Sequence, residues 1–219
     1  MPETFFNPHQ RATIEAAMAR IIPTDDTPGA REAGCIDFLE RYLSGIDYIF
    51  AKPDGSGFEV LEGKSADAWR QRIELMRTRY AEGIHDLDTR ARAHFFSDFV
   101  DLTPAEQDDI LQDIEKAGNG EPTTLTVSEG LAGPVSAEPA LQQTSTEVDL
   151  DFLPLLVTHT RQGFYADPIY GGNKGQIGWK VIGFPGPASM KEVHIGRYTT
   201  LQYFAEGEAE KVKEFHDGL

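Results

Sequence analysis

The stretch HTRQGFYADPIYGGNKGQIGWKVIGFPGP, residues 159–187, sets the interpretation of this chain of 219 residues. It holds seven glycines, three prolines and five aromatic residues, and we find no helical or strand period in it. Glycine and proline at this density favour turns. A disordered linker would not carry so many rings, because exposed rings are costly to hydrate. The stretch therefore predicts a long ordered loop whose rings lie against the chain's own core, a ligand or another protein.

Charge and composition exclude several classes of function. The net charge of −16 argues against nucleic acid and against an anionic membrane surface as a partner. The single cysteine, Cys35, excludes an intrachain disulfide and is predicted to be a small buried residue. No apolar run reaches the length that spans a bilayer. The N-terminus has no basic and apolar signal region, so we expect that the chain does not direct its own export.

Amphipathic patterns before residue 120 predict about five helices. In order, their predicted starts are Asn7-Pro8, about Arg31, the N-cap Ser65, a point before Leu87, and the capping box Thr103-Pro104-Ala105-Glu106. Pro23 is predicted to end the first helix, and short strands are considered around residues 58–61. The predicted fold class is mainly α: a bundle of about five helices, then a long irregular C-terminal segment rich in glycine, proline and aromatic residues.

The chain is predicted to divide into three parts. Residues 1–118 form the helical bundle, and residues 119–148 form an acidic low-complexity arm, either a mobile loop or a segment that orders on a partner. Residues 149–219 hold a short apolar helix around residues 152–157, the glycine-rich loop and a charged terminal helix over residues 205–216. Together these parts are expected to make one compact domain with an extension.

No pattern in the sequence indicates an active site. The six histidines show no two-histidine spacing typical of a metal-binding helix. No glycine-rich phosphate loop, dinucleotide fingerprint or nucleophile elbow is present. We therefore predict no catalytic, cofactor-binding or metal-binding residues in this chain.

Two interpretations of residues 159–187 remain open. The loop can cover the helical bundle and complete its core, or it can be a docking surface, because aromatic residues with little charge make up the centres of interfaces. We favour docking, since a bundle of this size does not need about thirty loop residues to close its core. Asp167 and Asn173 are expected to fix turns within the loop through bonds from their side chains to the backbone. The predicted partner-binding residues are Phe164, Tyr165, Asp167, Pro168, Ile169, Tyr170, Asn173, Trp179 and Phe184.

Three blocks of the sequence resemble the gluconate 2-dehydrogenase subunit 3 family. They are FYADPIYGGN at residues 164–173, GWKVIGFPG at residues 178–186, and an N-terminal block over residues 21–34 that begins IIPTD. The resemblance covers most of the chain and is least specific over residues 119–148.

The resemblance implies a non-catalytic small subunit that binds no cofactor itself. Its partner would be an FAD-containing large subunit of the glucose–methanol–choline type, which oxidises a sugar, sugar acid or glycoside. A cytochrome c subunit often passes the electrons on in such complexes. We expect the small subunit to stabilise the flavoprotein, in the periplasm if both are exported together and in the cytoplasm if no signal exists.

Two other classes of function are kept as alternatives. The first is an assembly or export chaperone that leaves the mature flavoprotein. The second is an enzyme that acts alone through histidine and acidic residues distant in the sequence. Turnover or bound metal in the isolated chain would favour the second alternative.

Overall fold

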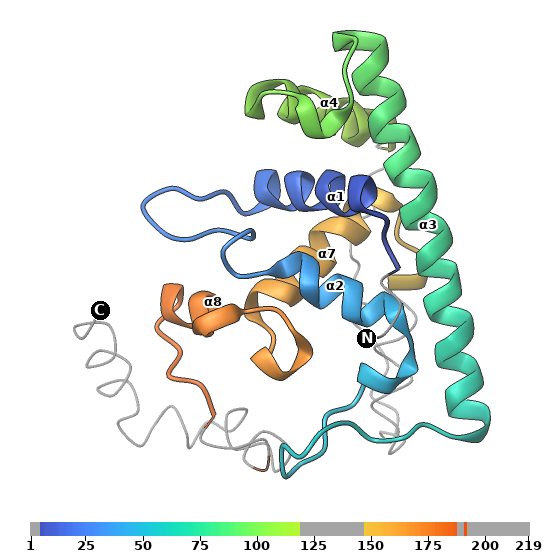
Figure 1. Cartoon of the computed structure of the whole chain (residues 1–219), viewed down its shortest axis with the longest axis vertical. Helices are drawn as coiled ribbons and strands as arrows, with labels where there is room; N and C mark the ends of the chain where they lie inside the picture. Colours follow the sequence, from blue (N-terminus) through green and yellow to red (C-terminus); the bar gives the residue numbers. More distant parts are fainter. Residues whose placement is uncertain (1–4, 119–146, 188–190, 192–219) are drawn as a thin grey trace, which may run out of the picture. The chain divides into compact units, whose positions relative to one another are not determined.

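The computed structural model describes residues 5–118, 147–187 and 191, and in these residues the chain is helical (Figure 1). Outside the helices, Ala51 and Phe58 form an isolated antiparallel bridge, and no strand occurs in the described ranges. The mainly α fold class is therefore confirmed. The elements in chain order are α1 (Pro8–Ile21), α2 (Cys35–Ser44), η1 (Ile46–Tyr48), α3 (Gly63–Phe95), η2 (Phe99–Asp101), α4 (Pro104–Gly118), α7 (Phe152–Tyr165), η3 (Pro168–Tyr170), η4 (Lys174–Gln176) and α8 (Ile177–Val181).

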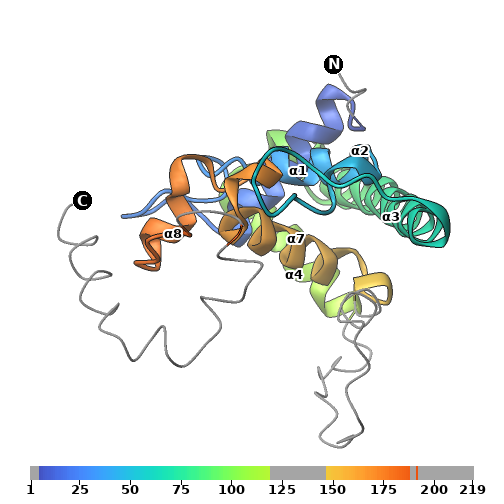
Figure 2. The same cartoon turned by 90° about the horizontal axis from the view of Figure 1, so that it is seen from below.

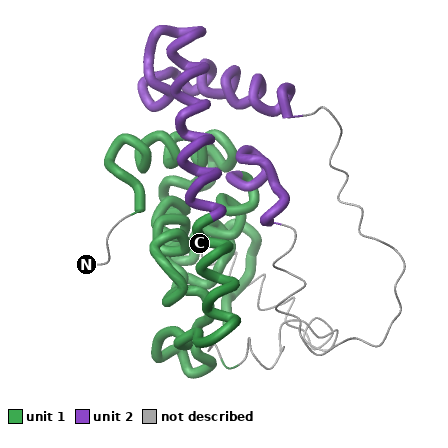
Figure 3. The backbone as a smooth tube through the Cα atoms, turned by 90° about the vertical axis from the view of Figure 1, so that its right-hand side faces the viewer, with its two compact units in different colours: residues 1–74, 157–219 green, residues 75–156 purple. Residues whose placement is uncertain are grey.

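The chain forms two compact units, which Figure 3 shows in different colours. Unit 1 comprises residues 1–74 and 157–219, and unit 2 comprises residues 75–156. The boundary falls inside the two helices α3 and α7. The predicted acidic arm lies outside the described residues except for its last two positions, as does the predicted terminal helix.

Helix ends follow local capping chemistry at two of the predicted places. Asn7 accepts a hydrogen bond from the backbone of Gln10 at 2.9 Å, and the Gln10 side chain bonds back to the Asn7 backbone at 3.1 Å. At the start of α4, Thr103 and Glu106 make the same reciprocal pair. The predicted cap at Ser65 is wrong, because α3 already begins at Gly63 and Ser65 lies in its first turn.

Unit 1 has its core where α1 meets α2 (Figures 1 and 2). Both helices bury an apolar stripe at helical spacing. Helix α2 also contacts η3, so the C-terminal segment belongs to the same core. The fully or almost fully buried residues of this unit include Ile14, Ala17, Met18, Cys35, Ile36, Leu39, Leu43 and Phe164.

Unit 2 is organised along the second half of α3. Its buried residues at helical spacing on α3 are Met76, Tyr80, Ile84, Leu87 and Ala91, and they are joined by the buried Phe99, Ile110, Leu155 and Leu156. The sequence predicted two separate helices over this part of the chain, and the structure shows one continuous helix instead. A glycine inside a helix costs only about 1 kcal/mol, so Gly83 does not interrupt it. A ring occupies the space that a side chain at Gly83 would need: a Cβ there would lie 2.1 Å from Phe152.

The prediction of a loop without helical structure over residues 159–187 is also wrong in part. Helix α7 does not stop near residue 157 but continues to Tyr165, and α8 forms later in the same stretch. Pro154 lies in the first turn of α7, where a proline is tolerated as predicted. Gly163 lies inside α7 and packs closely against Cys35, because a Cβ at this position would lie 3.1 Å from the Cys35 Cα.

Candidate partner-binding site

The C-terminal segment, residues 159–187, lies within unit 1, and its part after α7 packs against the last turn of that helix. Two glycines permit the backbone after α7 to approach the last turn of that helix closely. A Cβ on Gly178 would lie 1.9 Å from the carbonyl oxygen of Phe164, and one on Gly172 would lie 2.2 Å from the carbonyl oxygen of Gly163. Real Cβ atoms do not approach backbone this closely, so only glycine fits at these two positions.

Asn173 joins the loop to α7 and α8 through its backbone N–H and through the amide nitrogen and oxygen of its side chain. Its backbone N–H donates to Gly163 at 2.8 Å, and its side-chain amide donates to the Ala166 carbonyl at 2.9 Å. Its side-chain oxygen accepts from the backbone N–H of Gly178 at 2.8 Å. The residue is fully buried with φ at 47°, a left-handed conformation that asparagine tolerates better than most residues. Asn173 therefore fixes the turn as predicted.

Asp167 caps the short helix η3. Its carboxylate accepts a hydrogen bond from the backbone N–H of Ile169 at 2.9 Å. This confirms the predicted bond from the Asp167 side chain to the backbone of its own turn. Pro168 follows as the first residue of η3, where its missing N–H has no helical partner to lose.

The structure places two of the predicted anchor rings inside unit 1. Phe164 is 1% exposed and Trp179 is 6% exposed. The indole N–H of Trp179 donates to the Tyr165 carbonyl at 2.7 Å, and the ring of Phe184 meets the Trp179 ring edge-on at 5.3 Å. In this conformation Phe164 and Trp179 support the segment rather than present their rings to a partner.

The remaining predicted residues are partly accessible. Pro168, Ile169, Tyr170 and Phe184 are half-buried. The hydroxyl of Tyr170 accepts a hydrogen bond from the backbone of Ala51 at 3.2 Å. Its ring packs edge-on against Phe58 at 5.7 Å. Tyr170 thus connects the segment to the loop that contains Ala51 and Phe58. Tyr165 is more accessible, with 40% of its surface exposed.

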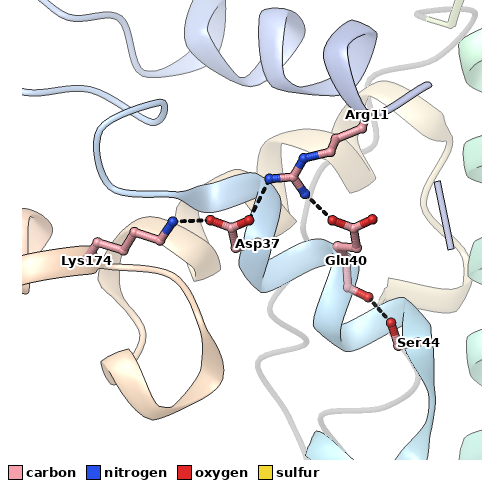
Figure 4. Close-up of polar contacts among 5 residues, drawn as sticks. All are labelled: Arg11, Asp37, Glu40, Ser44 and Lys174. Atoms are coloured by element: carbon pink, nitrogen blue, oxygen red, sulfur yellow. Dashed lines mark hydrogen bonds and ion pairs between the residues drawn. The ribbon is translucent and has the colours of Figure 1, made fainter. Parts of the chain in front are cut away.

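A group of charged residues, here called the charged clasp, connects α1, α2 and the segment (Figure 4). It consists of Arg11, Asp37, Glu40 and Lys174. The Arg11 guanidinium bonds to Asp37 at 2.6 Å and also pairs with Glu40, while Lys174 pairs with the second oxygen of Asp37. Burial alone would raise the pKa of Asp37, but the hydrogen bonds from Lys174 and Arg11 outweigh it and hold that pKa below its usual value.

Backbone contacts support the same attachment. The backbone N–H of Lys174 donates to the Ala33 carbonyl at 2.9 Å, and the Arg41 guanidinium donates to the Ile169 carbonyl at 2.6 Å. Sequence analysis found neither Arg41 nor the charged clasp. The partners are separated by 26 to 137 positions, so no local pattern reveals them.

Three exposed apolar side chains stand at the C-terminal ends of α7 and α8, two helices that the hydrogen bond from the Trp179 indole to the Tyr165 carbonyl joins. We call them the α7–α8 apolar surface: Tyr165 at 40%, Val181 at 36% and Ile182 at 54% exposure. Only Tyr165 was predicted from the sequence. Val181 and Ile182 follow Trp179 by two and three positions, but nothing in their pattern indicated which of these residues would be buried.

The single cysteine and the acidic and histidine side chains of the described residues were compared with the needs of a nucleophile and of a metal site. Burial raises the pKa of Cys35 to about 12, so its thiol stays protonated and is a poor nucleophile. The prediction of a buried cysteine is confirmed. Within the described ranges, no group of three or more histidine, cysteine, aspartate or glutamate residues is placed to hold a metal ion.

Comparison with known families matches residues 8–186 to the model of gluconate 2-dehydrogenase subunit 3. The chain belongs to the gluconate 2-dehydrogenase subunit 3 family. The match covers nearly all of the described residues of both units, and it confirms the resemblance seen in the sequence. Comparisons with curated proteins and with solved structures gave no match. Of the helices in the described residues, none has the length and apolar character to cross a membrane.

Proposed function

We propose that this chain is the non-catalytic small subunit of an FAD-dependent dehydrogenase complex. It binds and stabilises a flavoprotein of the glucose–methanol–choline type that oxidises a sugar, sugar acid or glycoside. Membership of the gluconate 2-dehydrogenase subunit 3 family supports this proposal, because the family is named for a subunit of an enzyme that dehydrogenates gluconate, a sugar acid. FAD belongs to the partner in this proposal, and a cytochrome c subunit is a further candidate member of the complex.

The construction of the C-terminal segment supports a docking role. Its backbone is fixed by Asn173, Asp167 and the charged clasp, so the segment has little conformational freedom to lose on binding. The α7–α8 apolar surface remains accessible on this rigid support. Apolar and aromatic side chains of this kind supply the buried centre of a stable interface.

Fewer of the predicted residues are proposed to touch the partner than the sequence suggested. The rings of Phe164 and Trp179 are already used inside unit 1, so they act by holding the surface in place. Tyr165, Val181 and Ile182 are the side chains that we propose to touch the flavoprotein. The half-buried Pro168, Ile169, Tyr170 and Phe184 would contribute their remaining exposed atoms at its edge.

The experiment is purification of the tagged chain from its native host, with Ile182→Asp beside the wild type. The wild type should recover a flavin-containing protein in fixed proportion. Ile182→Asp should lower the affinity about tenfold or more, because it places a charge in a surface that becomes desolvated. Ile182 is 54% exposed, so the substitution should leave folding almost unchanged.

Val60→Asp is the matched control, because Val60 is 78% exposed in unit 1 but lies outside the segment. It should recover the flavoprotein as well as the wild type does. Equal losses for both variants would refute a specific contact at Ile182. Recovery of substoichiometric, salt-sensitive flavoprotein would favour the chaperone alternative, because transient interfaces are smaller and more polar.

A further inference from the structure

Two positively charged residues lie beside the α7–α8 apolar surface. Arg161 precedes Tyr165 by four positions on α7 (Figure 1), and both residues are exposed. Residues four apart are neighbours on the surface of a helix, with their Cβ atoms about 5–6 Å apart. Lys180 precedes Val181 in α8 and is half-buried. Each of the two helices therefore places one cation next to the apolar side chain that it contributes.

Neither cation makes an ion pair with an acidic side chain in the part of the chain that the structure describes. Lys174, the third cation of the C-terminal segment, is instead paired with Asp37 in the charged clasp. The one acidic residue of the segment, Asp167, uses a carboxylate oxygen to cap η3, and its one histidine is fully buried. The charges of Arg161 and Lys180 are therefore available to a partner.

The charge of the segment is opposite to that of the whole chain. Residues 159–187 hold three basic residues and one acidic residue, whereas the chain holds 20 basic and 36 acidic residues. Charges at the edge of an interface guide the encounter and select a partner of opposite charge. An apolar centre with cations at its edge thus fits a protein face that is apolar at its centre and carries carboxylates around it.

Other occupants fit this arrangement less well. Anionic membranes are bound through clusters of about 4–8 basic residues, and only two are present here. Nucleic acid requires several cations to neutralise its phosphates. The net charge of −16 opposes both ligands. A second copy of this chain would carry the same negative charge, and a two-fold contact would set the two basic patches against each other.

We propose that Arg161 and Lys180 are specificity-determining residues of the docking surface, and that they pair with carboxylates at the edge of the matching face of the flavoprotein. The identity of the partner rests on the proposed function. The apolar side chains supply most of the binding energy, because an exposed ion pair contributes little. The two cations supply selectivity, since a protein with basic groups at the facing positions is repelled.

The test is a competition in the native host, whose cells make two differently tagged copies of the chain, one wild type and one variant, in excess over the flavoprotein. The flavin recovered with each tag is measured. Arg161→Gln with Lys180→Gln should recover about a third of the flavoprotein that the wild type recovers, and Arg161→Glu with Lys180→Glu about a tenth or less. Arg161→Lys with Lys180→Arg should compete as well as the wild type, because both charges remain.

Glutamine and glutamate have almost the same size and shape, so only a role of the charge separates these two double variants. Equal losses in both would show that the side chains act by packing and would refute the inference. Recovery equal to that of the wild type in both would refute it as well, while the proposed function stands. If the wild type itself recovers no flavoprotein, the inference and the proposed function both fail.

Lys52→Glu with Lys64→Glu is the matched control, because both lysines are exposed in unit 1, lie outside the segment and give the same change of net charge. This variant should compete like the wild type. A loss as large as that of Arg161→Glu with Lys180→Glu would show a general effect of net charge and refute a specific contact. Binding of the wild type to phosphatidylglycerol vesicles that both glutamate substitutions abolish, with unchanged recovery of flavoprotein, would assign the two cations to a membrane and also refute the inference.

Discussion

Replacing Asn173 with alanine should loosen the C-terminal segment from α7. The asparagine side chain bonds to the Ala166 carbonyl and to the Gly178 N–H, and both bonds disappear in the variant. The bond to Gly178 is fully buried, so its N–H would be left without a partner. Alanine must also adopt the left-handed φ of 47°, which suits it less well than asparagine.

The magnitude follows from these losses. A buried group left without a partner costs about 1–3 kcal/mol, and we take the higher part of that range for Gly178 and the lower part for the partly buried Ala166. The left-handed conformation adds about 1 kcal/mol. The variant should therefore lose about 4 kcal/mol of unfolding free energy, a large share of the 5–15 kcal/mol typical of a folded domain. Its melting temperature should fall by about 8–16 °C.

Tryptophan fluorescence during urea unfolding is a suitable assay. Both tryptophans of the chain, Trp69 and Trp179, belong to unit 1. A Trp69→Phe background leaves Trp179 as the reporter, and its indole lies within the segment. Asn173→Gly in the same background is the control, because glycine loses the side-chain bonds but adopts the left-handed φ easily. It should be about 1 kcal/mol more stable than Asn173→Ala.

The reasoning is refuted if Asn173→Ala changes the unfolding free energy by less than about 0.5 kcal/mol, the range of an ordinary surface substitution. Equal stability of the glycine and alanine variants would show that the backbone conformation contributes nothing, leaving only the hydrogen bonds.

Three further predictions concern other parts of the chain. Gly83→Ala should destabilise unit 2 by about 1–3 kcal/mol in urea unfolding although alanine favours helices, because its Cβ would lie 2.1 Å from Phe152. The control is Gly118→Ala, which should not destabilise the chain because no atom lies within 4 Å of the added Cβ. A stabilising effect of Gly83→Ala would contradict the close packing of Phe152 on α3. The pKa of Asp37 is held below the ordinary 3.8, so its contribution to stability is complete above that pH and is lost as the pH falls through the folded-state pKa. Asp37→Asn should therefore be less stable than the wild type at pH 7 and should show a smaller loss in acid, and an unchanged acid profile would contradict the charged clasp. Cys35 should resist a thiol reagent in the folded chain and react after unfolding, because it is buried and its pKa is raised to about 12, whereas rapid labelling of the native chain would contradict this.

Local chemistry made part of the fold predictable from the sequence. The capping residues at Asn7 and Thr103 act within three positions, so their patterns are visible in the sequence. The same holds for Asp167, which bonds two positions along the chain. Gly83 shows the limit of this approach, because its role depends on Phe152, which is far away in the sequence.

The candidate site was less predictable than the fold, because the composition of a segment does not determine which of its side chains point into the core and which face the solvent. The density of rings in residues 159–187 correctly indicated an ordered segment, but it did not show that Phe164 and Trp179 point into unit 1 while Ile182 is exposed. The charged clasp depends on pairs such as Lys174 and Asp37, which are 137 positions apart. Such pairs are set by how helices pack, which a single sequence does not specify locally.

The most direct test of the account is size-exclusion chromatography of the tagged chain purified from its native host, at high salt, with absorbance and dehydrogenase activity followed across the peak. The account predicts that the chain, flavin and activity elute together in a constant ratio. A colourless chain that elutes alone, with the activity in a separate peak that lacks it, would contradict the claim that this protein is a resident subunit.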